Sequence, residues 1–251
     1  MRLDNKVAII TGGNRGIGRA IALSFARKGA KVVVVGRNKT RCDEVVTQIS
    51  TEDGCALGIQ ADIASEADVA KMVEQTKDKF KRIDILVNNA AVNLPYRTVT
   101  ELRLDEWNWI IGINLTGTFI CCRAVLPQMI TQRFGKIINL ASIGGRIGAA
   151  GRSPYRASKA AIINFTECLA AEVKEFDIDV NAICPGAVET DMMSEITGGE
   201  IPKHAMPPED IAAVAVFLAS DESRAITGTS INAFGRGNPL FGASTSVRYS
   251  K

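Results

Sequence analysis

The sequence predicts one α/β domain in which helices flank a doubly wound, parallel β-sheet. Short apolar runs alternate along the chain with longer segments of helical periodicity. The runs are continuous stretches of Val and Ile, which indicates strands that are buried on both faces. With 251 residues, 46% of them hydrophobic, the chain is long enough to bury one large core.

The first half predicts three strand-helix units and a fourth strand. The apolar run 7–10 precedes a helical period at 19–28, the run 31–35 precedes 39–49, and the run 57–59 precedes 66–80, before a strand at 83–87. This order is typical of parallel strands joined by crossover helices.

The second half continues the alternation with a helix at 104–132, a strand at 136–140, a helix at 154–175 and a strand at 178–184. A shorter helix at 208–220 and a strand at 229–233 complete the domain, which we expect to end at residue 235. Pro127 lies inside the first of these helices and predicts a kink, because proline removes a backbone hydrogen bond. Residues 236–251 are rich in Gly, Ser and Thr and predict an irregular tail.

Charge and composition argue against several classes of function. The net charge is only +3 and the signs are interspersed, so we expect neither a nucleic acid nor a membrane as partner. The charged N-terminus does not resemble a signal peptide, which favours a cytoplasmic location. The six cysteines show no C-x-x-C spacing and predict reduced, mostly buried thiols, and the sole histidine, His204, has no partner at metal-ligand spacing.

A glycine-rich loop follows the first expected strand. Gly12, Gly16 and Gly18 have the spacing G-x-x-x-G-x-G where the first helix begins. Glycines allow the backbone to approach a pyrophosphate, and the helix N-terminus offers free N–H groups. The alternative is a simple strand-to-helix turn, but the position in the first unit favours dinucleotide binding.

The end of the second strand bears on the choice of cofactor. NAD enzymes usually carry an acid there for the ribose hydroxyls, whereas this chain has Arg37, with Arg15 in the glycine loop. Two guanidinium groups suit a 2′-phosphate, so the sequence predicts NADP(H). The alternative is that both arginines are solvated surface residues.

Tyr155 and Lys159 lie four residues apart in an expected helix and therefore share one face. An adjacent ammonium lowers the pKa of a phenol, so Lys159 is expected to make Tyr155 an efficient proton donor for a carbonyl reduced by hydride. Ser142 lies thirteen residues upstream. Taken alone, a Tyr and a Lys at this spacing can also arise by chance in an amphipathic helix.

With these pieces together, the sequence resembles the short-chain dehydrogenase/reductase family, which has a Rossmann-type fold, and within it the 3-oxoacyl-[acyl-carrier-protein] reductases. The resemblance covers roughly residues 6–235. It depends on an ordered set of residues: the loop 11–18, Asp62, Asn88-Asn89-Ala90, Asn114, Ser142, Tyr155, Lys159, Pro185-Gly186 and Thr190.

The resemblance implies a role for each of these positions. Ser142 holds the substrate oxygen, Tyr155 exchanges the proton, Lys159 tunes Tyr155 and binds the nicotinamide ribose, and Asn114 anchors a water that supplies protons. Asp62 binds the adenine, and Thr190 binds the carboxamide or a phosphate. The expected cofactor-binding residues are Gly12, Asn14, Arg15, Gly16, Ile17, Gly18, Arg37, Asp62, Ile63, Asn89, Tyr155, Lys159, Pro185, Gly186, Val188 and Thr190.

Four departures from the family pattern bear on the substrate and the assembly. Ala91 replaces a glycine, the lid segment between residues 190 and 208 is short, and Ala-Phe-Gly at 233–235 replaces the usual Asp-Gly-Gly. Carrier-protein docking in the family uses two arginines; Arg133 matches one, whereas Phe176, between Glu175 and Asp177, stands at the other.

The main expectation is therefore an NADP(H)-dependent carbonyl reductase or secondary-alcohol dehydrogenase acting on a small molecule. A 3-oxoacyl-[acyl-carrier-protein] or 3-oxoacyl-CoA reductase is the alternative. A dinucleotide sensor without turnover is the alternative of a different class, and the intact Ser142, Tyr155 and Lys159 argue against it. From the resemblance we also expect a homodimer or homotetramer.

Overall fold

A seven-stranded parallel sheet with the strand order β3-β2-β1-β4-β5-β6-β7 forms the centre of the computed structural model, which describes residues 1–237. Its strands are β1 Val7–Thr11, β2 Lys31–Gly36, β3 Cys55–Gln60, β4 Ile85–Asn88, β5 Gly135–Leu140, β6 Ile178–Pro185 and β7 Ser230–Ala233. The helices are α1 Gly16–Arg27, α2 Lys39–Thr51, α3 Glu66–Phe80, α4 Leu104–Ile111, α5 Gly117–Gln132, α6 Ser153–Val173, α7 Asp191–Thr197 and α8 Pro208–Ala219.

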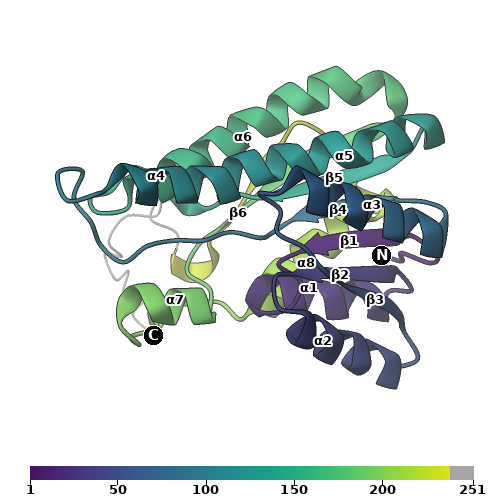
Figure 1. Ribbon diagram of the computed structural model, residues 1–251, viewed down its shortest axis with the longest axis horizontal. Coiled ribbons are helices and arrows are strands. Elements are labelled where there is room, and N and C mark those ends of the chain that lie inside the picture. Colours follow the sequence, from purple (N-terminus) through teal and green to yellow (C-terminus); the bar gives the residue numbers. More distant parts are fainter. Residues whose placement is uncertain (238–251) are drawn as a thin grey trace, which may run out of the picture.

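Helices cover both faces of the sheet, as the sequence predicts (Figure 1). Successive side chains of β1 point to opposite faces: Ala8 and Ile10 pack with α1, α2 and α8, whereas Val7 and Ile9 pack with α3, α5 and α6. Burial on both sides explains why the strands are continuous Val and Ile runs. Some of the helices that follow strands begin with a side-chain cap, such as Asn38 before α2 and Ser65 before α3.

The region between β4 and β5 is divided into two helices, whereas the sequence predicts one helix at 104–132; the kink at Pro127 stays a prediction. The α5 helix continues through this proline to Gln132, and the irregular turn lies earlier, in a π-helical segment η1, Gly112–Thr116, between α4 and α5. By length and composition 104–132 is apolar enough to cross a bilayer. In this fold it is a core helix that packs against α3, α6 and the sheet.

The order of the strands creates a crevice at their carboxyl ends. The chain moves outward from β1 to β3 on one side and from β4 to β7 on the other, so the loops after β1 and β4 diverge. Open α/β sheets bind ligands at this switch point. The loops that carry the predicted site residues all end there.

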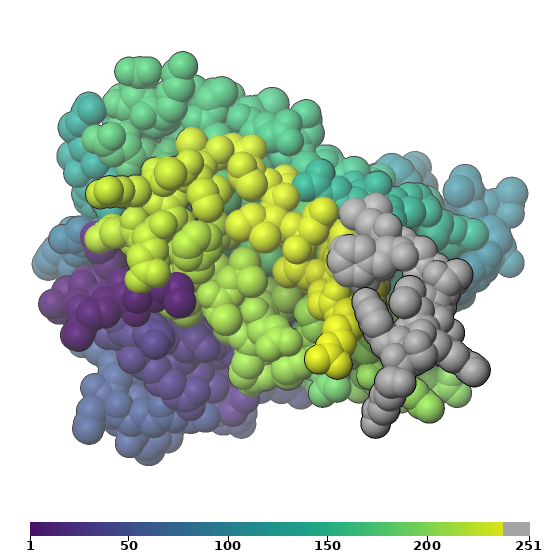
Figure 2. Space-filling model, turned by 180° about the vertical axis from the view of Figure 1, so that it is seen from behind, coloured from purple at the N-terminus to yellow at the C-terminus, as the bar shows by residue number. Residues whose placement is uncertain are grey.

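The C-terminal part of the described chain closes the far edge of the sheet. Strand β7 pairs with β6, and a short 3₁₀ turn, η5 Gly235–Gly237, follows it. From behind, these last residues run across the surface in yellow (Figure 2). The predicted tail at 236–251 lies outside the described residues, apart from Arg236 and Gly237.

Candidate active site

In the glycine loop after β1, the backbone turns tightly and passes close to the backbone at the start of helix α1. Gly12 and Gly16 have φ angles of +61° and +51°, in the left-handed region that favours glycine. A Cβ at Gly18 would lie 2.2 Å from the Gly12 carbonyl oxygen, so Gly18 allows helix α1 to start directly under the loop. The loop thus presents the N-terminus of α1 to the crevice, as a pyrophosphate site requires.

Hydrogen bonds from β4 fix this loop in place. The Asn89 side-chain amide donates to the carbonyl oxygens of Thr11 and Gly12, at 2.9 and 3.1 Å. The Thr11 hydroxyl accepts from the backbone N–H groups of Asn89 and Ala90. The two sides of the switch point are therefore joined by side chains as well as by strand pairing.

Arginines lie at the cofactor end of the crevice in a different arrangement from that predicted. Arg37 is exposed after β2 and lines the cavity with Arg41, one turn further along α2. Arg15 also lines the cavity, but its guanidinium pairs with two carboxylates of α7, Glu195 at 3.3 Å and Asp191 at 3.9 Å.

The predicted catalytic residues Ser142, Tyr155 and Lys159 meet beyond the carboxyl end of β5. Ser142 lies just after this strand, and its hydroxyl accepts from the Gly144 N–H at 3.0 Å. Tyr155 and Lys159 project from α6, with the Lys159 Nζ 5.7 Å from the centre of the Tyr155 ring. The same Nζ donates to the Leu140 carbonyl oxygen at 2.6 Å, which anchors α6 to the end of β5.

The pKa of Tyr155 shifts in the direction opposite to the prediction. Burial raises the pKa of its phenol, while interactions with Ser142, Arg152 and Arg156 oppose the rise. Burial also lowers the pKa of Lys159 to about 8. The lysine does not govern the tyrosine here because it is itself desolvated and directed at the Leu140 carbonyl. In this state the phenol is protonated at neutral pH and is able to donate.

Asn114 lies in the π-helical segment η1, and its side chain hydrogen-bonds to the loop after β4. Its Oδ1 accepts from the Val92 N–H at 2.8 Å, and its Nδ2 donates to the Val92 carbonyl and to the Ser158 hydroxyl. It is fully buried and does not line the cavity. The sequence-based role of a water anchor for Lys159 stays a prediction.

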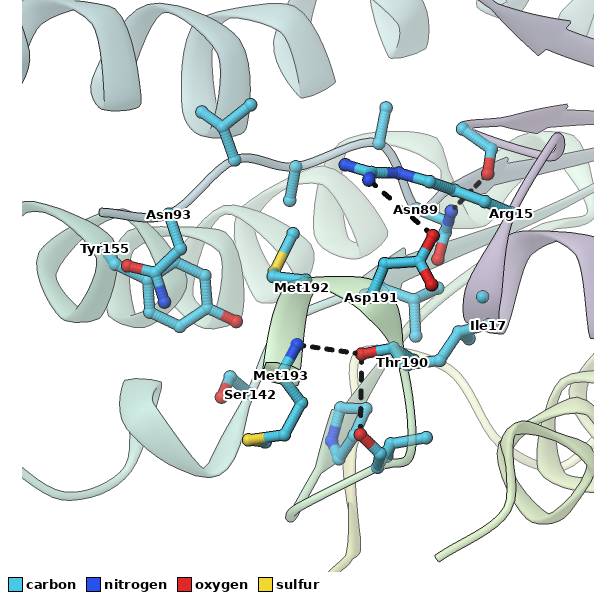
Figure 3. A pocket seen from close by; sticks show the side chains of 18 of the residues that line it. Arg15, Ile17, Asn89, Asn93, Ser142, Tyr155, Thr190, Asp191, Met192 and Met193 are labelled. Atoms are coloured by element: carbon cyan, nitrogen blue, oxygen red, sulfur yellow. Dashed lines mark hydrogen bonds and ion pairs between the residues drawn. The ribbon is translucent and has the colours of Figure 1, made fainter. Parts of the chain in front are cut away.

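One cavity of about 710 Å³ brings these parts together. All the predicted site residues line it except Gly18 and Asn114. These two lie behind the wall: Gly18 packs against the Gly12 carbonyl, and Asn114 bonds to Val92. Figure 3 shows Tyr155 and Asn93 at one end, Arg15 and Asp191 at the other, and Met192 of α7 between them. Thr190 caps α7 by accepting from the Met193 N–H, so the short lid segment forms a helix of seven residues at the cavity wall.

Sequence reasoning missed several lining residues. Arg41 was detectable, because it lies four residues after Arg37 at the start of a helix. Arg156 lies beside Tyr155 in α6 and was detectable in the same way. Others come from loops and from α7, whose approach depends on the tertiary fold, among them Asn93, Arg152, Met192, Met193, Ile196 and His204. Two cysteines, Cys55 and Cys168, are exposed, and four are buried, as the sequence predicts for most of them.

Three of the departures from the family pattern can be placed in the structure. Ala91 lines the cavity. Phe234 is buried, and a Cβ at Gly186 would lie 3.1 Å from its Cα, so this segment packs tightly behind the β6 loop. Arg133 donates to the Glu175 carbonyl oxygen at 2.9 Å and lies 3.9 Å from the Asp177 carboxylate.

The residues present fit a dinucleotide. The crevice has the glycine cradle at the start of α1, Asp62 and Ile63 after β3, and Pro185 and Gly186 after β6. A Cβ at Gly16 would approach the Thr190 side chain within 3.2 Å, so the glycine loop lies directly against the residue that caps α7.

Comparison with known proteins shows the family of the chain. The sequence pattern of the short chain dehydrogenase family matches residues 6–200. A 3-oxoacyl-[acyl-carrier-protein] reductase of Synechocystis sp. is 39% identical over 240 residues, which cover 93% of this chain and 97% of the relative. A (2S)-[(R)-hydroxy(phenyl)methyl]succinyl-CoA dehydrogenase subunit of Thauera aromatica is 38% identical, with 96% and 99% covered.

Solved structures agree with these matches. The 3-ketoacyl-(acyl-carrier-protein) reductase from Brucella melitensis, complexed with NADH, superposes with a TM-score of 0.87 at 32% identity, covering 94% of this chain and 99% of that chain. Levodione reductase superposes with a TM-score of 0.88 at 30% identity, covering 92% and 96%.

The lowered pKa of Lys159 predicts a pH dependence of stability. Between pH 8 and 10.5 the unfolded chain binds a proton at this lysine that the folded chain has lost, so stability rises with pH. The free energy of unfolding should rise by up to about 1.4 kcal/mol per pH unit in this window, relative to a Lys159→Met variant. Denaturant titrations at pH 7.5 and 9.5 measure this, and a difference between the two proteins that does not change with pH would contradict it.

Proposed function

The chain belongs to the short-chain dehydrogenase family, and we propose that within this family of oxidoreductases it reduces the 3-oxo group of an acyl thioester with NADPH. The observation that carries the proposal is the similarity to 3-oxoacyl-[acyl-carrier-protein] reductases over more than nine-tenths of both chains, together with Ser142, Tyr155 and Lys159 in one cavity. The relatives favour this reading over the small free ketone expected first from the sequence.

The reaction follows from the positions of the side chains. When bound, the reduced nicotinamide supplies a hydride to the carbonyl carbon. The protonated Tyr155 phenol donates its proton to the carbonyl oxygen as the C–O double bond becomes a single bond. Ser142 orients that oxygen, and the nearby charges of Arg152 and Arg156 stabilise the phenolate that remains.

Support for NADP(H) comes from the end of β2. Arg37 and Arg41 line the cavity there, and no acid follows the strand to accept hydrogen bonds from an adenine ribose. An exposed guanidinium pair suits a 2′-phosphate. Arg15 is a third candidate, which would have to leave its partners on α7.

The surface around Arg133 favours a thioester that is presented without a carrier protein. Arg133 is already paired with Asp177, and Phe176 packs half-buried against the core at the place of the second docking arginine. The positive charge of Arg133 is therefore partly neutralised, which weakens its attraction for an acidic carrier protein. Coenzyme A or a short pantetheine thioester requires no such surface.

Location and assembly stay predictions: a cytoplasmic protein that forms a dimer or tetramer and binds neither nucleic acid nor a membrane. A sensor without turnover would leave the proton-donating arrangement at Tyr155 without a use.

Removal of the phenolic hydroxyl tests the mechanism. Tyr155→Phe should lower kcat by about 10²- to 10⁴-fold, the usual contribution of a general acid, while the protein still binds NADPH. Steady-state kinetics with acetoacetyl-CoA and a fluorescence titration of NADPH measure the two effects. Turnover close to that of the wild type, with cofactor bound, would show that Tyr155 is not the proton donor.

Arg37→Ala should weaken NADPH binding by roughly tenfold or more and leave NADH binding unchanged, because only NADPH carries the phosphate. Lys39→Ala is the matched control: Lys39 lies two residues after Arg37 at the start of α2, pairs with Asp43 and does not line the cavity. Cofactor titrations decide the matter, and a wild-type protein that binds NADH as tightly as NADPH would refute the preference.

The presentation of the acyl group tests the substrate. Acetoacetyl groups on coenzyme A, on pantetheine and on an acyl carrier protein should give similar kcat/KM values. Arg133→Ala should change the value for the carrier protein by no more than about fivefold, the scale of an exposed ion pair. A strong preference for the carrier protein would refute the docking argument, and inactivity towards all three would refute the thioester.

A further inference from the structure

Two arginines flank the proton donor at the substrate end of the cavity. Arg152 immediately precedes α6 and Arg156 follows Tyr155 in its first turns; both side chains are half-buried and line the cavity. Arg152 donates to the Ile196 carbonyl oxygen at 3.2 Å, and Arg156 donates to that of Ile147. Within residues 1–237 neither guanidinium pairs with a carboxylate.

The surroundings of these arginines are positive. Among the described residues that line the cavity, the carboxylates are those of Asp62 and Asp191. Asp191 faces Arg15 at the opposite end (Figure 3), and Asp62 follows β3. The first turn of α6 contains no acid, and the dipole of this long helix adds positive potential where Arg152 stands. At the substrate end, the two guanidinium groups therefore have no carboxylate partner among the described residues, and they lie near a helix N-terminus, which disfavours positive charge.

Packing positions the Arg156 side chain and the backbone that carries Arg152 beside the reacting group. A Cβ at Gly144 would lie 3.3 Å from the Arg156 Cγ and 3.4 Å from the Ser142 Oγ, so the arginine stem lies against the turn that carries Ser142. A Cβ at Gly151 would meet the Tyr96 ring at 2.2 Å, so Tyr96 packs on the backbone just before Arg152. Both charges also act on the Tyr155 phenol, which places them within electrostatic reach of the bound carbonyl.

We propose that Arg152 and Arg156 bind a carboxylate of the substrate, so that this site prefers ketones that carry a free carboxylate close to the carbonyl that is reduced. The planar guanidinium matches a carboxylate with two parallel hydrogen bonds. The inference rests on the proposed reduction at Tyr155 and adds the anionic group to the substrate class. The thioester itself is neutral near its 3-oxo group and does not account for two cations there.

A binding experiment without turnover tests this. The protein loaded with NADP⁺, which has no hydride to give, is titrated calorimetrically with acetoacetate and with acetoacetamide, its neutral isostere. The wild type should bind acetoacetate more tightly by roughly tenfold or more, the effect of hydrogen bonds to a charged group. Arg152→Met and Arg156→Met should each reduce this ratio towards one, while binding of acetoacetamide shows that the site is still folded.

Two further variants sharpen the result. Arg152→Lys keeps a point charge without the planar fork and should retain part of the preference. Arg224→Met removes one positive charge from an exposed position outside the cavity and should leave the ratio unchanged. Equal binding of the two ligands by the wild type, no binding of acetoacetate, or a ratio that survives both Met variants would overturn the proposal.

The thioester proposal can fail separately. Turnover of acetoacetyl-CoA with NADPH reports on the thioester, whereas the ratio of acetoacetate to acetoacetamide reports on the arginines. Acetoacetate binding that depends on the arginines, without turnover of acetoacetyl-CoA, would refute the thioester and support the carboxylate site. The reverse result would refute only the carboxylate site.

Discussion

The adjacency of β1 and β4 is the constraint on which the rest of the structure depends. Because the chain winds outward from this pair in opposite directions, the two loops that follow it separate and leave a crevice. The crevice is useful only if its walls keep a fixed spacing, and Asn89 provides this by bonding from the β4 loop to the backbone of the β1 loop. Strand order thus opens the site, and the side chains of Asn89 and Thr11 tie its two sides together.

Burial decides the electrostatics of the reacting groups. Lys159 and Tyr155 are enclosed by the end of β5 and by α6, so the charged form of each is disfavoured: the pKa of the lysine falls and that of the tyrosine rises. The phenol therefore stays protonated as a donor. The hydrogen bond with Ser142 and the charges of Arg152 and Arg156 favour its ionisation and oppose the effect of burial.

The sequence predicted what depends on local spacing. Strands, helices, the glycine loop and the pair Tyr155 and Lys159 are set by neighbours within a few residues, and nearly all the predicted cofactor residues line the cavity. The errors concern distant partners. Nothing near Arg15 in sequence shows that it meets Glu195, and nothing near Asn114 shows that it bonds to Val92. Pro127 is accommodated in α5 without ending it, because packing against the sheet and α3 outweighs the lost hydrogen bond.

The two walls of the cavity differ in how firmly they are held. Ser142, Tyr155 and Lys159 stand on β5 and α6, whose packing is buried and whose Lys159–Leu140 contact is short. Helix α7 has no buried residue, and its polar contacts with the rest of the cavity wall are the exposed pairs of Arg15 with Glu195 and Asp191 and the bond from Arg152 to the Ile196 carbonyl. Exposed ion pairs contribute at most about 1 kcal/mol to stability, so displacing α7 requires less free energy than displacing β5 or α6. These contacts are made by arginines that also face the cavity, so an anion at either end competes with α7 for the same guanidinium. The reacting side chains thus stand on the wall that is held by buried packing, whereas α7 is held by exposed polar contacts.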